Sequence, residues 1–333
     1  MENKTESFSD KVKDMVPFLI MAAFVLIVQV GSLWLSATEY MAAQPPLDNP
    51  ENVSYAIYYI IMLLIVSALL IFLMRRNKKV VIRSMIYLSI CTTLFYVFVA
   101  TADKAIGYST YTVIFAIFCA LALTALIHKY PEWYIIDSVG LLIAIGVCAL
   151  VGVSLSYMPI IILMVGLLIY DFISVYKTKH MITLAHGMMD LKLPILFVIP
   201  KKWKYSFIKD DFSEKPESDN EISDEKEKTD SVSKAADGEE KKKKLDALFM
   251  GLGDAVIPTL LVVSSNHFLE HDDIIAIPSL FAMVGTFFGF AVLMYLVSKG
   301  KPQAGLPLLN TGTILGFIIG VIVSGTTLSI SFM

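Results

Sequence analysis

Two aspartates stand inside long apolar stretches of the sequence, where an ionised carboxylate is costly. Asp171 lies in LLIYDFISVY and Asp254 lies in MGLGDAVIPTLLV. A charged side chain at the centre of a bilayer costs about 2.5–3.5 kcal/mol on insertion scales, so such residues usually serve a function. Two carboxyl groups that meet in a poorly solvated place share a proton, and the pair can act as one acid and one base on water. The residues therefore predict either an aspartyl protease or a transporter that relays ions or protons.

The composition indicates that these acids belong to an integral membrane protein. Of the 333 residues, 56% are hydrophobic and only 17% are charged, and the mean hydropathy is +0.69. Soluble domains are less apolar and carry more charge. The net charge of −3 does not indicate nucleic-acid binding, because the charges are concentrated in one segment rather than on a basic face.

Apolar runs long enough to cross a bilayer recur along the chain and predict an all-α polytopic membrane protein with nine transmembrane helices. The expected spans are 16–36, 55–74, 80–100, 111–127, 134–152, 157–177, 245–264, 274–298 and 306–330. If the N-terminus is cytoplasmic, all 27 lysines and arginines except Lys104 fall on the cytoplasmic side. This distribution follows the positive-inside rule and places the C-terminus outside.

This topology brings the two acids to a similar depth. Asp171 is expected about 6 residues, or roughly 9 Å, from the cytoplasmic end of the sixth span. Asp254 is expected about 8 residues, or roughly 12 Å, from the same end of the seventh span, if that helix begins near residue 245. The two carboxylates then face each other from consecutive antiparallel helices.

The chain divides into five expected regions. Residues 1–15 form a cytoplasmic tail and residues 16–177 form the first six helices. Residues 178–209 contain an interfacial helix followed by an extended segment. Residues 210–244 are rich in Glu, Asp, Lys and Ser, cannot bury a core and are expected to be disordered. Residues 245–333 form the last three helices.

Residues next to the acids could shape the site. Gly251 and Gly253 lack side chains and would admit another backbone or a water beside Asp254. Tyr170 could donate a hydrogen bond to the neighbouring acid, although packing against lipid explains it equally well.

Other conspicuous residues are expected to have structural roles. Asp137 falls in the first turn of the fifth span, where it can reach water and interact with the positive end of the helix dipole. Small residues at helical spacing would let the last two spans approach closely, and the three cysteines would act as small apolar residues. These residues are Gly285, Gly289, Gly312, Gly316, Gly320, Cys91, Cys119 and Cys148.

The motifs together resemble the presenilin and signal peptide peptidase family. The pair YD at Tyr170–Asp171, the GxGD motif formed by Gly251, Leu252, Gly253 and Asp254, and the charged loop between them all match. A last span that opens with GLPLLN also matches. The resemblance implies an intramembrane aspartyl protease in which Asp171 and Asp254 are catalytic and the rest of the GxGD motif lies in the active site.

The third family motif, Pro-Ala-Leu, is only partly present. The matching stretch is Ala304, Gly305, Leu306 and Pro307, so the usual Pro and Ala are replaced. The resemblance implies that this stretch shapes the active site and contacts substrate, and Pro307 suits the first turn of a helix. The cytoplasmic N-terminus is similar to that of presenilins, and the compact loops are most like those of archaeal homologues. An archaeal source would place the protein in the cell membrane, and a eukaryotic source in an endomembrane.

The sequence lacks an H-E-x-x-H zinc motif and a G-x-S-x-G serine motif, so metalloprotease and serine protease mechanisms are not expected. The two aspartates would act on water with no metal or organic cofactor. The expected partners are transmembrane-helix protein substrates and the lipid bilayer, and a homo-oligomer is left open. Cleavage requires local unwinding of the substrate helix, whose freed backbone groups then need partners. The run Ile195, Leu196, Phe197, Val198 and Ile199 has strand-forming composition and is hypothesised to pair with the extended substrate. The alternative is a segment that simply contacts lipid.

Overall fold

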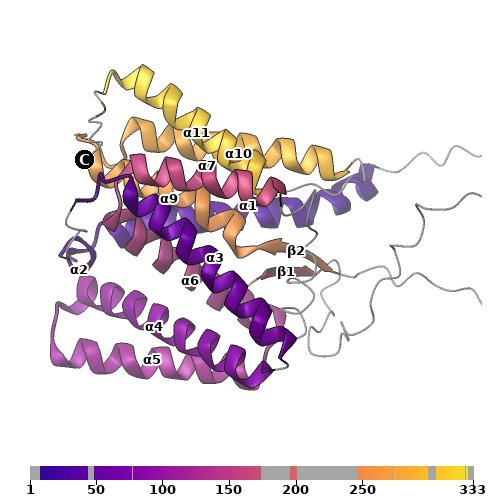
Figure 1. Cartoon of the computed structure of the whole chain (residues 1–333), viewed down its shortest axis with the longest axis vertical. Coiled ribbons are helices and arrows are strands. Elements are labelled where there is room, and N and C mark those ends of the chain that lie inside the picture. The colour runs from indigo at the N-terminus through magenta and orange to yellow at the C-terminus, as the bar shows by residue number, and fades with distance from the viewer. Residues whose placement is uncertain are drawn as a thin grey trace, which may run out of the picture.

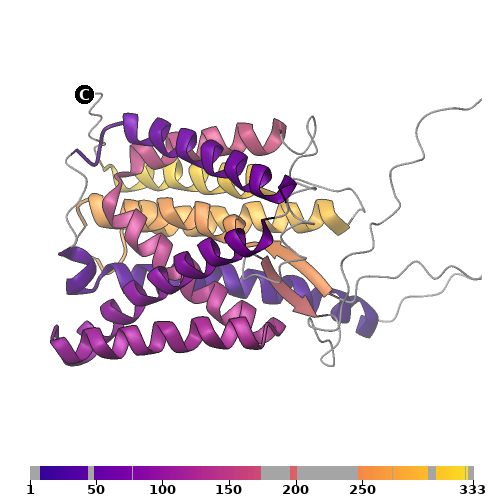
Figure 2. The same ribbon diagram turned by 60° about the horizontal axis from the view of Figure 1, so that its bottom comes forward.

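The computed structural model describes residues 8–43, 49–76, 78–173, 196–200, 247–271, 273–298, 305–326 and 328. The expected disordered region 210–244 and interfacial helix lie outside these residues. In the described part, helices run side by side as a bundle and two short strands lie at one end (Figure 1 and Figure 2). The helices are α1 (Phe8–Ser36), α2 (Glu39–Ala42), α3 (Ser54–Arg75), α4 (Lys79–Ile106), α5 (Thr110–Lys129), α6 (Trp133–Ser154), α7 (Tyr157–Ile173), α9 (Leu252–Phe268), α10 (Ile277–Ser298) and α11 (Gly305–Ser324).

Every expected span overlaps one of these helices. Seven of the described helices are long and apolar enough to cross a membrane, and α7 and α9, with 17 residues each, are shorter. The helical membrane architecture is therefore confirmed. The first helix begins at Phe8, inside the stretch 1–15 that was expected to be a tail.

The hairpin between α4 and α5 shows how local sequence ends one helix and begins the next. Gly107 follows α4 with a φ of 84°, a conformation that glycine adopts without steric cost. Ser109 then caps α5, because its hydroxyl accepts a hydrogen bond from the backbone N–H of Thr112 at 3.3 Å. The two helices consequently pack against each other along one edge of the bundle (Figure 1).

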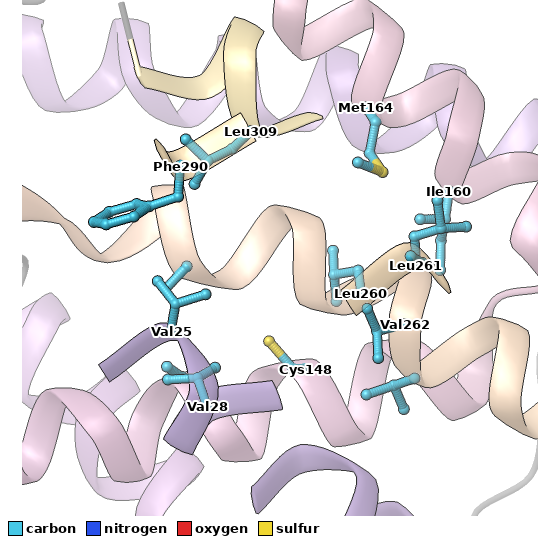
Figure 3. Packing of buried hydrophobic residues seen from close by; sticks show 14 of the residues in the cluster. Val25, Val28, Cys148, Ile160, Met164, Leu260, Leu261, Val262, Phe290 and Leu309 are labelled. Atoms are coloured by element: carbon cyan, nitrogen blue, oxygen red, sulfur yellow. The ribbon is translucent and has the colours of Figure 1, made fainter. Parts of the chain in front are cut away.

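Helix α9 occupies the centre of the bundle and contacts α1, α6, α7, α10 and α11. Its apolar residues Leu260, Leu261 and Val262 are buried in the largest hydrophobic cluster. Figure 3 shows them surrounded by side chains from the neighbouring helices, among them Val25, Val28, Cys148, Ile160, Met164, Phe290 and Leu309. The helix that carries Asp254 is thus held from several directions.

The glycine seam expected between the last two spans is confirmed. A Cβ built on Gly285 would overlap the backbone carbonyl of Gly312, and one built on Gly316 would overlap that of Phe281. Helices α10 and α11 can therefore approach this closely only because their facing positions carry no side chains.

The start of the seventh span differs from the expectation. Strand β1 (Leu196–Pro200) pairs antiparallel with β2 (Ala247–Gly251), with Leu196 opposite Gly251 and Pro200 opposite Ala247. Helix α9 begins only at Leu252, so the predicted helical start at residue 245 is wrong. The apolar run is continuous across this boundary, and hydropathy alone does not separate a buried strand from a buried helix.

Candidate active site

The two acids lie at neighbouring ends of packed helices. Asp171 is buried two residues before the described end of α7, and Asp254 is partly exposed in the first turn of α9. Helices α7, α9 and α11 contact one another pairwise. The carboxyl groups of Asp171 and Asp254 are close enough to interact electrostatically. The structure thus brings together the two acids that the sequence paired.

The position expected for Asp254 within its helix is wrong by about six residues. With α9 beginning at Leu252, Asp254 lies at the start of the helix rather than roughly 12 Å inside it. The preceding residues reach the site as strand β2. A strand therefore leads directly to the turn that carries Asp254.

Two glycines border the Asp254 carboxyl group. A Cβ built on Gly305, the first residue of α11, would lie 3.0 Å from Asp254 Oδ2, which is tighter than ordinary contacts. A Cβ on Gly251, the last residue of β2, would lie at 3.4 Å from the same oxygen. A Cβ on Gly253 would meet no atom within 4 Å among the described residues. Gly305 and Gly251 thus lie close to the acid, whereas no described residue lies close to the Cβ position of Gly253.

The remaining motif residues have simpler surroundings. Tyr170 is exposed and makes no hydrogen bond to another described residue. Leu306 and Pro307 are partly exposed in the first turn of α11, where proline is tolerated. Ala304 and Ile195 lie outside the described residues.

Asp137 does not have the solvated role expected for it. Its side chain is buried, and its Oδ1 accepts a hydrogen bond of 2.8 Å from the backbone N–H of Val198 in β1. The expectation is wrong because the partner comes from a segment 61 residues away, which covers the position. The only signal in the sequence was an acid within an otherwise apolar run.

This contact determines the direction in which the backbone groups of β2 point. In an antiparallel pair, a residue directs both its N–H and its C=O to the same side. Because the N–H of Val198 points to Asp137, Val198 and its partner Phe249 form a non-hydrogen-bonded pair. The N–H and C=O of Phe249 therefore point away from β1. Among the described elements, the substantial contacts of β2 are with β1 and with α9, which follows it directly.

Comparison with known sequences decides the family. The family described as signal-peptide peptidase, presenilin aspartyl protease matches residues 21–326, which is nearly the whole chain. The chain belongs to this family. No curated protein matches this chain.

Solved structures agree with this assignment. A presenilin family intramembrane aspartate protease in space group C222 is 34% identical, with a TM-score of 0.65 over 92% of this chain and 100% of that one. A second structure of a presenilin family intramembrane aspartate protease, in space group P2, is 35% identical, with a TM-score of 0.65 over 93% of this chain and 99% of that one. The resemblance to presenilins is confirmed, and the protease is an aspartic endopeptidase of the intramembrane class.

Proposed function

We propose that this presenilin-family protease hydrolyses peptide bonds in transmembrane segments of other membrane proteins, with Asp171 and Asp254 as a coupled general acid and base. The observation that carries the proposal is the placement of two carboxyl groups, from α7 and α9, within electrostatic reach of each other. Gly305 of α11 supports it, because this residue of the third motif lies against Asp254.

The proposed reaction needs only these two groups and water. The ionised carboxylate takes a proton from water while its oxygen attacks the scissile carbonyl carbon, and the neutral carboxyl group donates a proton to the carbonyl oxygen. In the second step the newly protonated aspartate donates its proton to the amide nitrogen, the newly ionised aspartate takes a proton from a hydroxyl of the tetrahedral intermediate, and the C–N bond breaks. A new carboxyl group and a new amine result, and the pair returns to its starting protonation state. The two aspartates exchange roles, so neither needs to be ionised permanently.

We further propose that the chain crosses the membrane nine times, with a cytoplasmic N-terminus and an external C-terminus. The supporting observation is that each expected span overlaps a helix, including the shorter α7 and α9. The strands precede α9 and lie at the same end as the acids, so the site faces the cytoplasmic side in this topology (Figure 1). Residues 210–244 then form a cytoplasmic loop between the two catalytic helices.

The edge of β2 that faces away from β1 is the proposed binding site for unwound substrate. The hypothesis of pairing through residues 195–199 needs adjustment, because β1 has β2 on one side and Asp137 on the other. The outward N–H and C=O of Phe249 instead offer one donor and one acceptor to an extended peptide. The pairing would satisfy backbone groups that the substrate loses when its helix unwinds. Because β2 ends three residues before Asp254, such a strand would lead the scissile bond toward the acids.

Replacing Phe249 by proline tests this pairing. Proline removes the N–H that points away from β1, so the β1–β2 hydrogen bonds remain. We expect the cleavage rate of a single-span substrate to fall about tenfold, the value of one hydrogen bond of roughly 1.4 kcal/mol. The matched control Phe249→Leu keeps the N–H and should retain wild-type activity. Equal rates for the proline variant and the wild type would rule out pairing at this edge.

The function itself is tested with purified protein and a single-span substrate. We expect cleavage in detergent and in proteoliposomes, without ion or proton flux through protein-containing vesicles. A peptide analogue with a hydroxyl-bearing tetrahedral carbon should inhibit, since transition-state analogues bind at least about 100-fold more tightly than substrates. Flux that depends on the two aspartates, together with a lack of cleavage, would instead identify a transporter.

A further inference from the structure

Asp137 lies outside the family motifs, yet it makes a buried contact across the fold. It belongs to the second turn of α6, and its Oδ1 accepts the Val198 N–H at 2.8 Å. The exposed fraction of Asp137 is 5% and that of Val198 is 1%. A buried hydrogen bond to a carboxyl oxygen is costly to lose, because the remaining partner stays desolvated.

The same face of α6 holds β1 through its side chains. A Cβ on Gly140, one turn after Asp137, would lie 3.3 Å from the ring of Phe197, so the glycine leaves room for that ring. Phe197 is fully buried and its ring centroid lies 5.0 Å from that of Phe24 in α1. Val198 packs in a separate cluster with Ile136 and Val139. Successive side chains of β1 thus enter two different cores, which opposes a one-residue slip of the strand.

The pairing of β1 with β2 links the position of β1 to the proposed active site. Phe197 lies opposite Met250 in β2, and Leu196 lies opposite Gly251, next to the start of α9. The side chain of Leu252 also reaches Gly140, at 3.5 Å from the Cβ position of that glycine. A short path therefore connects Asp137 through β1 and β2 to the turn that carries Asp254.

We propose that Asp137 is a positioning residue, whose hydrogen bond to Val198 sets the depth and register of the strand pair relative to Asp254 and so selects the substrate bond that is cleaved. The inference rests on the proposed function, and it adds a determinant of cleavage position to it. Asp137 acts through β1 and β2 and does not contact the reacting atoms.

The decisive measurement is the set of cleavage products, determined by mass spectrometry, together with kcat and KM for a single-span substrate. For Asp137→Ala we expect kcat to fall between about tenfold and a hundredfold, because small displacements of reacting groups have effects of this size. Cleavage should also occur at neighbouring peptide bonds, which gives additional products. Asp137→Asn retains an oxygen that can accept the Val198 N–H, so it should restore the wild-type products and bring kcat within about threefold of wild type, since the hydrogen bond is kept.

Ser138→Ala is the matched control, because Ser138 is exposed and its hydroxyl donates a hydrogen bond to the carbonyl of Tyr134 in its own helix. If Asp137→Ala does not fold, Asp137→Ser takes its place, since its hydroxyl is too short to reach the same donor. Wild-type kcat and products in the folded Ala or Ser variant would overturn the inference, as would an Asn variant that behaves like Ala. Asp254→Asn is measured in parallel: cleavage by that variant would reject the proposed function, whereas its inactivity combined with a silent Asp137→Ala would reject only the positioning role.

Discussion

Replacing either Asp171 or Asp254 by asparagine is expected to abolish cleavage of a single-span substrate. Asparagine has nearly the same shape as aspartate, but it can neither take a proton from water nor donate one to a carbonyl. General acid and base groups contribute about 10²- to 10⁴-fold each, so we expect each variant to lose at least about a thousandfold in kcat. The double variant should be no worse than either single one, because the two groups act as a unit.

The thermal unfolding temperature of these variants is measured as a control for misfolding. Asparagine replaces an ionisable group in a poorly solvated place by a neutral one of nearly the same shape, so the thermal unfolding temperature in detergent should be at least that of the wild type. Asp103→Asn, in the last turn of α4, makes the same chemical change away from the proposed site and should leave cleavage unchanged. Activity that survives in either Asp171→Asn or Asp254→Asn would remove the aspartate pair as the catalyst.

Replacing Gly305 by a residue with a larger side chain should lower kcat without replacing any titratable group. Its Cβ position lies 3.0 Å from Asp254 Oδ2 and 3.3 Å from Cγ, so any side chain there must push on the carboxyl group. Alanine requires a shift of only a few tenths of an ångström, and it is the residue that the family motif has at this position. We therefore expect Gly305→Ala to stay within about tenfold of wild type and Gly305→Val to lose about a hundredfold in kcat, as displacements near 1 Å typically do.

A control variant elsewhere in α11 distinguishes displacement of the Asp254 carboxyl group from a general disruption of the helix. Thr311→Val introduces a branched apolar side chain at an exposed position of the same helix and should have little effect. Binding of the hydroxyl-bearing peptide analogue should weaken in parallel with kcat, because the analogue contacts the displaced carboxyl group. A fully active Gly305→Val would mean that the Asp254 carboxyl is not confined by α11.

The local composition of the sequence was sufficient to predict most of the helices. The runs around residues 55–74 and 111–127 became α3 and α5 with ends within two residues of those expected. Such runs depend on nearest neighbours in the chain: they are long, uninterrupted and flanked by polar residues, and a bilayer leaves few alternatives to a helix. The glycines of α10 and α11 were equally informative, since four-residue spacing places them on one face.

The pairing of Asp171 with Asp254 also followed from the sequence, although part of the reasoning was wrong. Both acids lie at the same end of consecutive antiparallel helices, and this sufficed to bring them together. The position of Asp254 within its helix was wrong because residues 247–251 looked like the first turns of α9. The proximity of the acids did not depend on that detail.

What the sequence by itself determined is the helical membrane architecture, the two acids on neighbouring helices and the family to which the protease belongs. Each of these depends on local composition or on a short motif. The tertiary structure decided that residues 247–251 form a strand, that Asp137 holds β1 through Val198, and that Gly305 confines Asp254. These features depend on partners from distant parts of the chain. A strand or a buried carboxyl group becomes stable only when such a partner satisfies its hydrogen bonds, and no local pattern specifies which segment that partner is.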